Sequence, residues 1–202
     1  MSRRRRGETR REILNTAERL LQARGFHGFS YHHISEKLGV RNAAVHYHFP
    51  TKADLGAAVA RRFREDFAWW RRQLESRGLD GGARLEAYFD LDGRYASERK
   101  VCPLGVVGVE FGGLPPEMCR EAGALQEDVF AFLVDTLGDG RADGSMRFDG
   151  DVEDVARQVL AATQGGLQLA RVQGESAYYS VLKGLRSTLG MRELESARRL
   201  AG

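Results

Sequence analysis

The sequence predicts an all-α protein, with a small helix-turn-helix head of three helices at residues 1–50 and a helical-bundle body at residues 51–202. Three observations lead to this fold. Apolar residues recur every three or four positions through most of the chain. Capping residues and glycines separate these stretches, as they do at helix ends. Only residues 101–114, apolar and rich in glycine, leave a short strand as an alternative to a helix.

The first helix is predicted to begin at Thr9 and to end at Gly25. Thr9 and Glu12 have the spacing of a capping box, in which each side chain caps the other residue's backbone N–H. A glycine suits the left-handed conformation that often ends a helix. The apolar side chains between these ends share one helical face: Ile13, Ala17, Leu20 and Leu21.

Two short helices follow. Ser30 is the expected N-cap of a helix over residues 30–37, which Gly39 stops. A third helix is expected over residues 41–48. The tight turn through Gly39 and Val40 joins these two helices into a helix-turn-helix, the motif whose second helix enters the major groove of DNA.

A long fourth helix is predicted to begin at Thr51, with Asp54 as its reciprocal cap. Its apolar residues are three or four positions apart and form one continuous stripe: Leu55, Val59, Phe63, Phe67, Trp70 and Leu74.

Further helices and a loop complete the body. A fifth helix follows the break at residues 78–82. Residues 115–117 are expected to open another long helix, because proline suits the first helical position. Residues 138–151 are predicted to form a polar, glycine-rich loop. The last two helices are expected over residues 151–173 and 176–189.

Charge is distributed unevenly along the 202 residues, although the net charge is only +3. Residues 1–52 hold 11 Lys and Arg against 4 Asp and Glu, whereas the remainder holds 20 against 24. A basic head on a mildly acidic body favours a polyanion as the partner of the head. A solvated charged surface is the alternative that charge alone leaves open.

Composition also bears on the cellular location. No apolar run reaches the roughly 18 residues of a transmembrane helix. The run Arg3 to Arg6 lacks the apolar segment that follows the basic residues of a signal peptide. Cys102 and Cys119 are too few for a disulfide framework. We therefore expect a cytoplasmic protein without membrane association.

All five histidines lie within residues 27–48, a clustering typical of some metal and catalytic sites. However, His32 and His33 are adjacent, and His46 and His48 are two apart, so neither pair shares a helical face as zinc ligands four apart do. No cysteine lies nearby, and no aspartate or serine forms a nucleophile–base set with them. We expect no metal, no cofactor and no catalysis from this segment.

The helix-turn-helix instead predicts contacts with DNA. Val45 and Phe49 are the expected inward anchors, and Lys52 suits a phosphate at the start of the fourth helix. The run Arg3 to Arg6 either reaches an adjacent minor groove or forms a disordered, solubilising tail. The candidate DNA-binding residues are Arg4, Arg5, Ser30, His32, Arg41, Asn42, Ala43, Ala44, His46, Tyr47, His48 and Lys52.

Residues 9–55 resemble the DNA-binding head of the tetracycline-repressor (TetR) family. The resemblance lies in "TRREILNTAERLLQARGFHGFS", then "HISEKLGV", then "AAVHYHFPTKADL", whose second half is the most specific part. The sequence departs from the family at Arg41 and Asn42, where serine or threonine is often followed by lysine or glycine. The rest of the chain is similar to the family in length and helix order.

This resemblance implies roles for individual residues and for the body. Tyr47 and Lys52 would contact phosphates, and four residues would face the bases: Arg41, Asn42, Ala43 and His46. The body would bind a small-molecule effector and form a homodimer through its last two helices. The dimer would bind a pseudo-palindromic operator as double-stranded DNA and leave it when the effector binds.

Candidate effector contacts in the body are aromatic and polar side chains on faces that the pattern places inside. Core packing is the favoured explanation for any single aromatic. Gln164 is more suggestive, because a glutamine in an apolar helix needs a partner, and Gly165 and Gly166 permit close backbone approach. The candidates are Trp70, Tyr88, Tyr95, Cys102, Phe111, Phe130 and Gln164.

Cys102 is also a candidate sensor of oxidants or electrophiles. Arg99 and Lys100 lie just before it, and nearby cations favour the reactive thiolate. A buried structural cysteine is the commoner outcome.

The last two helices are apolar around more than one side, so they form either an internal pair or a seam with a second copy of the chain. The candidate dimer residues are Val155, Val159, Ala162, Leu169, Tyr178, Leu182 and Leu185.

The expected function is therefore a sequence-specific, homodimeric transcriptional repressor that responds to a small molecule, an electrophile or an oxidant. One alternative is a DNA-binding activator or architectural factor without a ligand response. A cysteine-based enzyme is disfavoured, because no histidine outside residues 27–48 is available as a base in the body.

Overall fold

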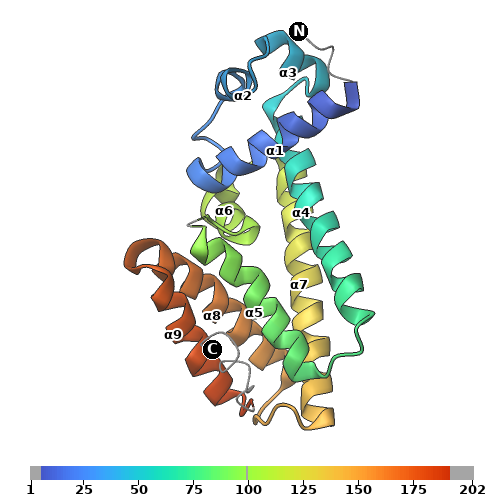
Figure 1. The fold of residues 1–202 in the computed structure, drawn as a ribbon, viewed down its shortest axis with the longest axis vertical. Coiled ribbons are helices and arrows are strands. Elements are labelled where there is room, and N and C mark those ends of the chain that lie inside the picture. Colours follow the sequence, from blue (N-terminus) through green and yellow to red (C-terminus); the bar gives the residue numbers. More distant parts are fainter. Residues whose placement is uncertain (1–5, 99, 192–202) are drawn as a thin grey trace, which may run out of the picture. The chain divides into compact units, whose positions relative to one another are not determined.

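The computed structural model describes residues 6–98 and 100–191. Within these residues the chain is helical and has no strand, which confirms the predicted all-α fold. The elements are α1 (Arg6–Arg24), α2 (Tyr31–Leu38), α3 (Asn42–His48), α4 (Lys52–Glu75), α5 (Gly81–Ser97), α6 (Pro103–Glu110), the 3-10 turn η1 (Phe111–Gly113), α7 (Pro116–Asp143), α8 (Val152–Gln173) and α9 (Glu175–Thr188) (Figure 1).

These elements form two compact units. The first consists of Met1–Arg71 with Lys100–Val129, and the second of Arg72–Arg99 with Phe130–Gly202. In the part of the chain that is described, no helix has the length and apolar character needed to cross a membrane.

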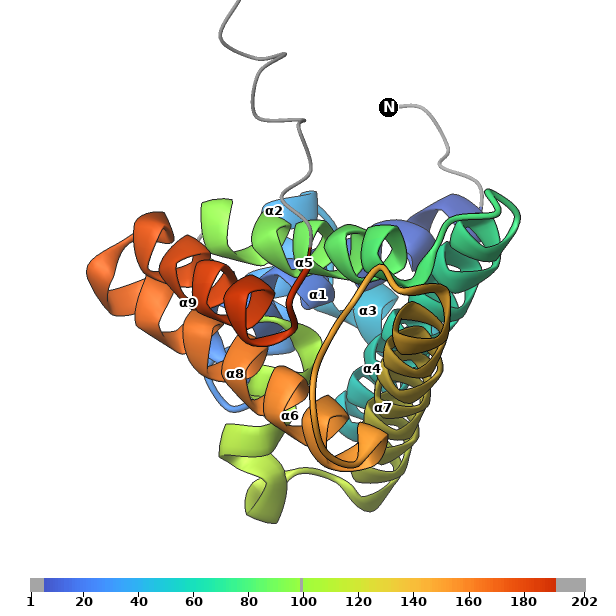
Figure 2. The same cartoon turned by 90° about the horizontal axis from the view of Figure 1, so that it is seen from below.

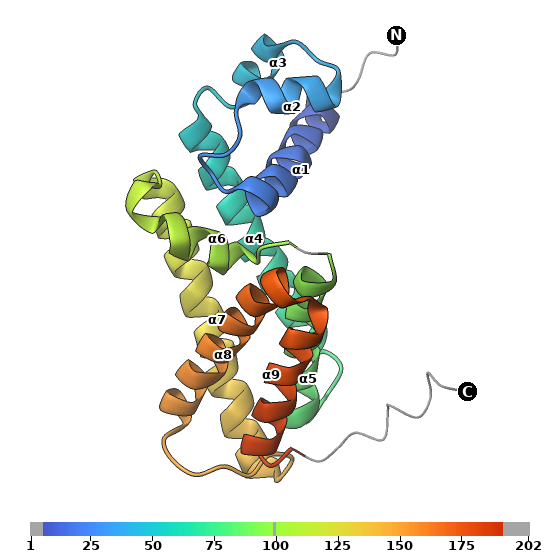
Figure 3. The same cartoon turned by 90° about the vertical axis from the view of Figure 1, so that its left-hand side faces the viewer.

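Within the first unit, α1, α2 and α3 form a three-helix head (Figure 3). The helix α2 packs against both α1 and α3. Ile13 of α1, Ile34 of α2 and Val45 of α3 have no exposed surface, so each helix contributes to one small core. The predicted three-helix head is confirmed.

Both ends of α2 are set by the residues predicted for them. Ser30 has extended backbone (φ −136°, ψ 172°), and its N–H donates to His33 Nδ1 at 3.0 Å. Gly39 ends the helix with a φ of 63°, a left-handed conformation that L side chains rarely adopt. The turn into α3 therefore depends on a glycine at this position.

The start and the buried stripe of α4 are also confirmed. The N–H of Thr51 donates to Asp54 Oδ2 at 2.9 Å, and the N–H of Asp54 donates to Thr51 Oγ1 at 3.1 Å. Of the predicted stripe, Trp70 is half-buried and the other five residues are buried. Its neighbour Trp69 is 59% exposed.

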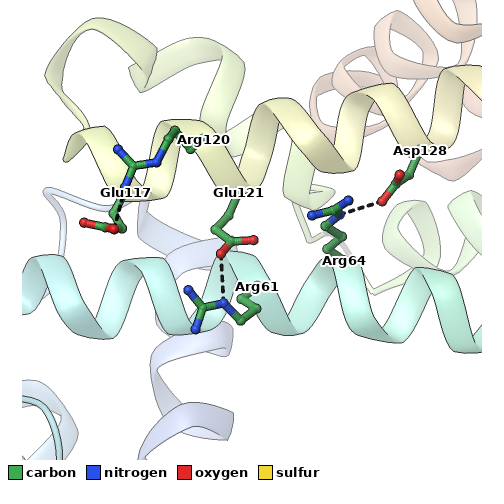
Figure 4. Close-up of polar contacts among 6 residues, drawn as sticks. All are labelled: Arg61, Arg64, Glu117, Arg120, Glu121 and Asp128. Atoms are coloured by element: carbon green, nitrogen blue, oxygen red, sulfur yellow. Dashed lines mark hydrogen bonds and ion pairs between the residues drawn. The ribbon is translucent and has the colours of Figure 1, made fainter.

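Ion pairs join α4 to the part of α7 that belongs to the first unit (Figure 4). Arg61 Nε lies 2.8 Å from Glu121 Oε1, and Arg64 Nε lies 2.7 Å from Asp128 Oδ2. Both arginines are exposed, so water and salt screen these pairs and each contributes little to stability.

Two predicted boundaries are wrong, and in each case the helix is longer than expected. The helix α1 begins at Arg6, so Thr9 lies inside it and does not cap its start. Glu8 lies in the first turn, where its charge suits the positive end of the helix dipole. The helix α7 continues to Asp143 instead of giving way to a loop at residue 138.

Packing explains the extension of α7. A Cβ atom at Gly81, at the start of α5, would collide with the backbone of Gly140 in α7. Arg84 of α5 and Asp139 of α7 form an ion pair beside this contact. The close approach that two glycines allow outweighs the weak helix propensity of glycine itself.

The strand alternative for residues 101–114 is wrong. Pro103 stands at the first position of α6, where its missing N–H costs nothing. The Sγ atom of Cys102 accepts the N–H of Gly105 at 3.2 Å and caps the helix. These two local features start a helix in a segment whose apolar residues fit either structure.

In the second unit, α5, α8 and α9 pack together, and α8 and α9 lie side by side (Figure 2). Tyr178 of α9 has no exposed surface, and its hydroxyl donates to the carbonyl of Phe89 at 3.3 Å. A Cβ atom at Gly166 would lie 3.1 Å from the Tyr178 ring, so the glycine permits the close approach predicted for it. Gly165 instead faces open space.

Candidate nucleic-acid interface

The inner side of α3 is anchored to the head. Val45 has no exposed surface and Phe49 is 3% exposed, which confirms both as inward anchors. The hydroxyl of Tyr31 in α2 donates to the carbonyl of Phe49 at 2.8 Å. A buried apolar contact and a buried hydrogen bond therefore fix α3 against α2.

The outer side of α3 is free of the core. The side chain of Tyr47 is 62% exposed, although a large aromatic residue is usually buried. Arg41 is the N-cap of α3, and its side chain makes no capping hydrogen bond. Of the other predicted contacts, Asn42, Ala43 and His46 are exposed and Ala44 and His48 are half-buried. The structure thus gathers the predicted α3 residues on one short helix.

His46 is held in place by contacts with α2 and with the residues that follow α3. Its ring meets that of Tyr31 edge-on, with 4.6 Å between the centroids, and its Nδ1 atom lies 3.3 Å from the carbonyl oxygen of Pro50. A ring fixed in this way presents a defined edge and has little conformational entropy left to lose on binding. Ser30 and His32, at the start of α2, are exposed.

Lys52 has a structural partner that the sequence did not indicate. Its ammonium donates to the carbonyl of Phe29 at 2.6 Å and lies 4.6 Å from the ring centroids of both Phe26 and Phe29. Partial burial lowers the pKa of Lys52, although Glu110 opposes this shift. An ammonium group has three donors, so a phosphate would share Lys52 with the α1–α2 turn.

The segment that contains α6 also holds the α1–α2 turn, a contact that the sequence analysis missed. The carboxylate of Glu110, at the end of α6, accepts the N–H of Phe26 at 2.5 Å and that of His27 at 3.3 Å. The N–H of Val101 donates to the carbonyl of Gln22 at 3.3 Å. These partners are more than 75 positions apart in the chain, so no local pattern signals them.

Asp92 is the second residue that the sequence analysis missed. It lies on the buried face of α5 and is 6% exposed. A signal was present, because its spacing from Leu85, Tyr88 and Phe89 places it on the same helical face as these large apolar residues.

The predicted effector contacts are divided between the two units. Trp70, Cys102 and Phe111 belong to the first unit, whereas the other four belong to the second. Phe111 is 53% exposed, so its expected place on an interior face is wrong: η1 turns its ring to solvent. Tyr88 is buried. Three others are half-buried: Tyr95, Phe130 and Gln164.

Cys102 is buried, with 3% of its surface exposed. Its sulfur caps α6, as described above. Burial and this structural contact restrict the access of an oxidant or electrophile to the thiol. Arg99, on which the sensor hypothesis partly relies, lies outside the described residues, as do Arg4 and Arg5 of the predicted N-terminal arm.

Three of the predicted dimer residues belong to the core of the second unit. Val159, Tyr178 and Leu182 are each at most 1% exposed within the single chain, and their contact with a second copy stays a prediction. Leu169 is 43% exposed. The remaining three are half-buried: Val155, Ala162 and Leu185. No group of three or more His, Cys, Asp or Glu suited to a metal ion occurs in the described residues.

Comparison with known proteins agrees with this architecture. Residues 13–59 match the family described as bacterial regulatory proteins, tetR family, and residues 81–183 match the tetracyclin repressor-like C-terminal domain. The chain is 30% identical over 78 residues to the HTH-type transcriptional repressor KstR2 of Rhodococcus jostii (strain RHA1). That match spans 39% of this chain and 38% of the relative.

Two solved structures match over nearly the full length. A TetR transcriptional regulator from Legionella pneumophila is 28% identical, with a TM-score of 0.80, over 94% of this chain and 100% of that one. A TetR-family regulator from Agrobacterium tumefaciens shares the fold with a TM-score of 0.87 and 24% identity, over 92% of this chain and 99% of that one. With a DNA-binding head and a C-terminal domain that both match, the chain belongs to the tetR family of bacterial transcription regulators.

Proposed function

We propose that the protein is a homodimeric repressor that binds a pseudo-palindromic operator and leaves it when a small-molecule effector binds the body. The observation that carries DNA recognition is α3, which is anchored on its inner side by Val45 and exposes Arg41, Asn42 and Tyr47 on its outer side. The similarity to a protein named as a transcriptional repressor supports repression over activation.

The exposed side chains divide into two roles by their chemistry. Arg41 and Asn42 carry donors and acceptors that match base edges in the major groove. Tyr47 and Lys52 suit phosphate oxygens, which fix the register of the protein on the duplex without reading its sequence. Arg4 and Arg5 would add a contact in the adjacent minor groove.

Dimerisation through α8 and α9 is proposed on the apolar surface that these helices expose. Val172 is 86% exposed, and Leu169 and Tyr179 are 43% and 46% exposed. Covering such residues with a second copy removes apolar surface from water. Two heads held in this way would read half-sites one helical turn apart, about 34–36 Å.

The effector would act by favouring a dimer whose head spacing no longer matches the groove. We further propose that the protein acts in the cytoplasm, without a cofactor and without enzymatic activity. An architectural DNA-binding protein is the alternative that the experiment must separate from a repressor.

The test is selection of DNA from a random pool, followed by a salt series on the enriched sequences. We expect an inverted repeat, bound at least a thousandfold more tightly than random DNA. Binding that only fades as salt rises, with no enriched sequence, would show an architectural role and contradict the proposal.

Two variants assign the contacts. Arg41→Ala is expected to weaken operator binding by about 5- to 150-fold and to relax the preference at one base pair, because it removes a base contact. Lys183→Ala removes a cation that is exposed on α9 and serves as the matched control. Equal affinities of the two variants would contradict the assignment of α3.

A further inference from the structure

The core of the second unit contains a carboxylate oxygen that the fold leaves unpaired. Asp92 is 6% exposed, and its Oδ2 atom has no hydrogen-bond partner within the described residues. Burial removes the water that stabilises a carboxylate, so buried polar atoms are almost always paired. An unpaired carboxylate oxygen in the body of a protein proposed to respond to a ligand is a candidate for a ligand contact.

Two hydroxyl groups accompany this carboxylate. Tyr88 lies one helical turn before Asp92 and hydrogen-bonds to it through its hydroxyl. The same hydroxyl oxygen lies 3.4 Å from Oγ1 of Thr163 on α8, which has no exposed surface. The three side chains form a polar cluster between α5 and α8, with an aromatic ring beside it: the centroid of Phe132 is 6.1 Å from that of Tyr88.

No cation of the described residues is among the influences on Asp92, although the guanidinium carbon of Arg84 lies 5.6 Å from the Phe132 ring centroid. Burial is the largest influence on Asp92 and raises its pKa to about 7, and the hydrogen bond from Tyr88 opposes this shift. A carboxyl group with such a pKa is near half ionisation at neutral pH. A positive charge placed beside it would complete its ionisation, so binding and charge are coupled at this position.

We propose that Asp92 binds the positively charged nitrogen of an organic ammonium effector, with the hydroxyls of Tyr88 and Thr163 as neighbouring polar contacts. The proposal rests on the proposed function and names its effector class. A carboxylate and an aromatic ring suffice to hold an ammonium group. A metal ion is disfavoured, because magnesium and calcium need several oxygen ligands and only one carboxylate is present in this cluster.

Binding is tested by calorimetry without DNA, using benzylammonium and benzyl alcohol at pH 8. The two probes are similar in size and differ in charge, and Asp92 is mostly ionised at this pH. The wild-type protein is expected to bind benzylammonium at least about tenfold more tightly, the usual gain from a hydrogen bond to a charged group. Equal binding of the two probes overturns the proposal.

Variants test whether Asp92 causes the preference for benzylammonium over benzyl alcohol. Asp92→Asn keeps the size of the side chain but removes the charge, and it is expected to abolish the preference for benzylammonium. Asp90→Asn is the matched control, because Asp90 lies on the same helix and is exposed. A preference that survives Asp92→Asn contradicts the assignment of the site.

A second measurement uses the wild-type chain and does not depend on how a variant folds. The carbon-13 signal of the Asp92 carboxyl is followed through a pH titration. Benzylammonium is expected to lower the pKa of Asp92, and benzyl alcohol is expected to leave it in place. An unchanged pKa with benzylammonium overturns the proposal.

These assays are independent of the proposed repressor function. Ammonium binding without an enriched operator would contradict the repressor alone. An operator without ammonium binding would contradict only the effector class proposed here.

Discussion

At the scale of single residues, the side chain of Lys52 stabilises the fold at a position where a DNA contact is expected. Its motif and its place at the start of α4 predict a phosphate contact. The structure adds the carbonyl of Phe29 and two aromatic rings as partners of the ammonium. These partners lie 23 or more positions away in the chain, so only the folded head reveals them.

Asp92 also gives a prediction for the free energy of unfolding. Its pKa is about 7 when folded, against 3.8 for an ordinary aspartate. Between these values the folded chain holds a proton that the unfolded chain releases. The stability that Asp92 contributes is therefore full below about pH 4 and is lost as pH rises through 7.

Asp92→Asn should remove this dependence. The measurement is urea unfolding from pH 4.5 to pH 8.5. As pH rises, the free energy of unfolding of the variant is expected to increase relative to that of the wild type by about a few kcal/mol. The exposed Asp90→Asn change is the control and should show a much smaller trend. A difference between Asp92→Asn and wild type that stays constant with pH would count against the raised pKa.

At the scale of helices and turns, the features that the sequence predicted well are local. The caps Ser30 and Thr51, the left-handed Gly39 and the apolar stripe of α4 depend on residues within one or two turns. The errors come from contacts across the chain. The end of α7 depends on Gly81, some 60 positions away.

The contact of Glu110 with the α1–α2 turn can be tested directly. Glu110→Gln removes the charge that strengthens two hydrogen bonds, so the turn should open more often. Hydrogen exchange of the Phe26 and His27 amides is the measurement, with an expected acceleration of about tenfold.

The control for this change is Glu127→Gln, which alters an exposed glutamate of α7. It should leave both amides unchanged. Unaltered exchange in Glu110→Gln would show that the carboxylate does not hold the turn in solution.

At the scale of the whole molecule, the two compact units do not follow the order of the elements along the chain. The predicted functional boundary at residue 50 remains a prediction. In the structure, α6 and the first part of α7 group with the head, whereas α5 groups with α8 and α9. Such grouping arises from contacts between distant segments, which composition and periodicity do not encode.

The proposed dimer is tested at this scale. Val172→Asp places a charge on the exposed apolar surface of α8 and is expected to yield a folded monomer with weakened operator binding. Sedimentation velocity measures the oligomeric state, and circular dichroism checks the fold. Lys37→Asp, an exposed change on α2, should leave the dimer intact. A Val172→Asp dimer of wild-type affinity would place the interface elsewhere.

The tryptophans of α4 have a practical consequence. The chain has two tryptophans, Trp69 and Trp70, and both lie in this helix. One is largely exposed, and the other packs with its ring centroid 5.5 Å from that of Phe67. Intrinsic tryptophan emission from the unlabelled protein therefore originates in a single element, the helix that continues from the DNA-binding head. Adding DNA or a candidate effector in a fluorimeter would report on the surroundings of α4 through a built-in optical probe.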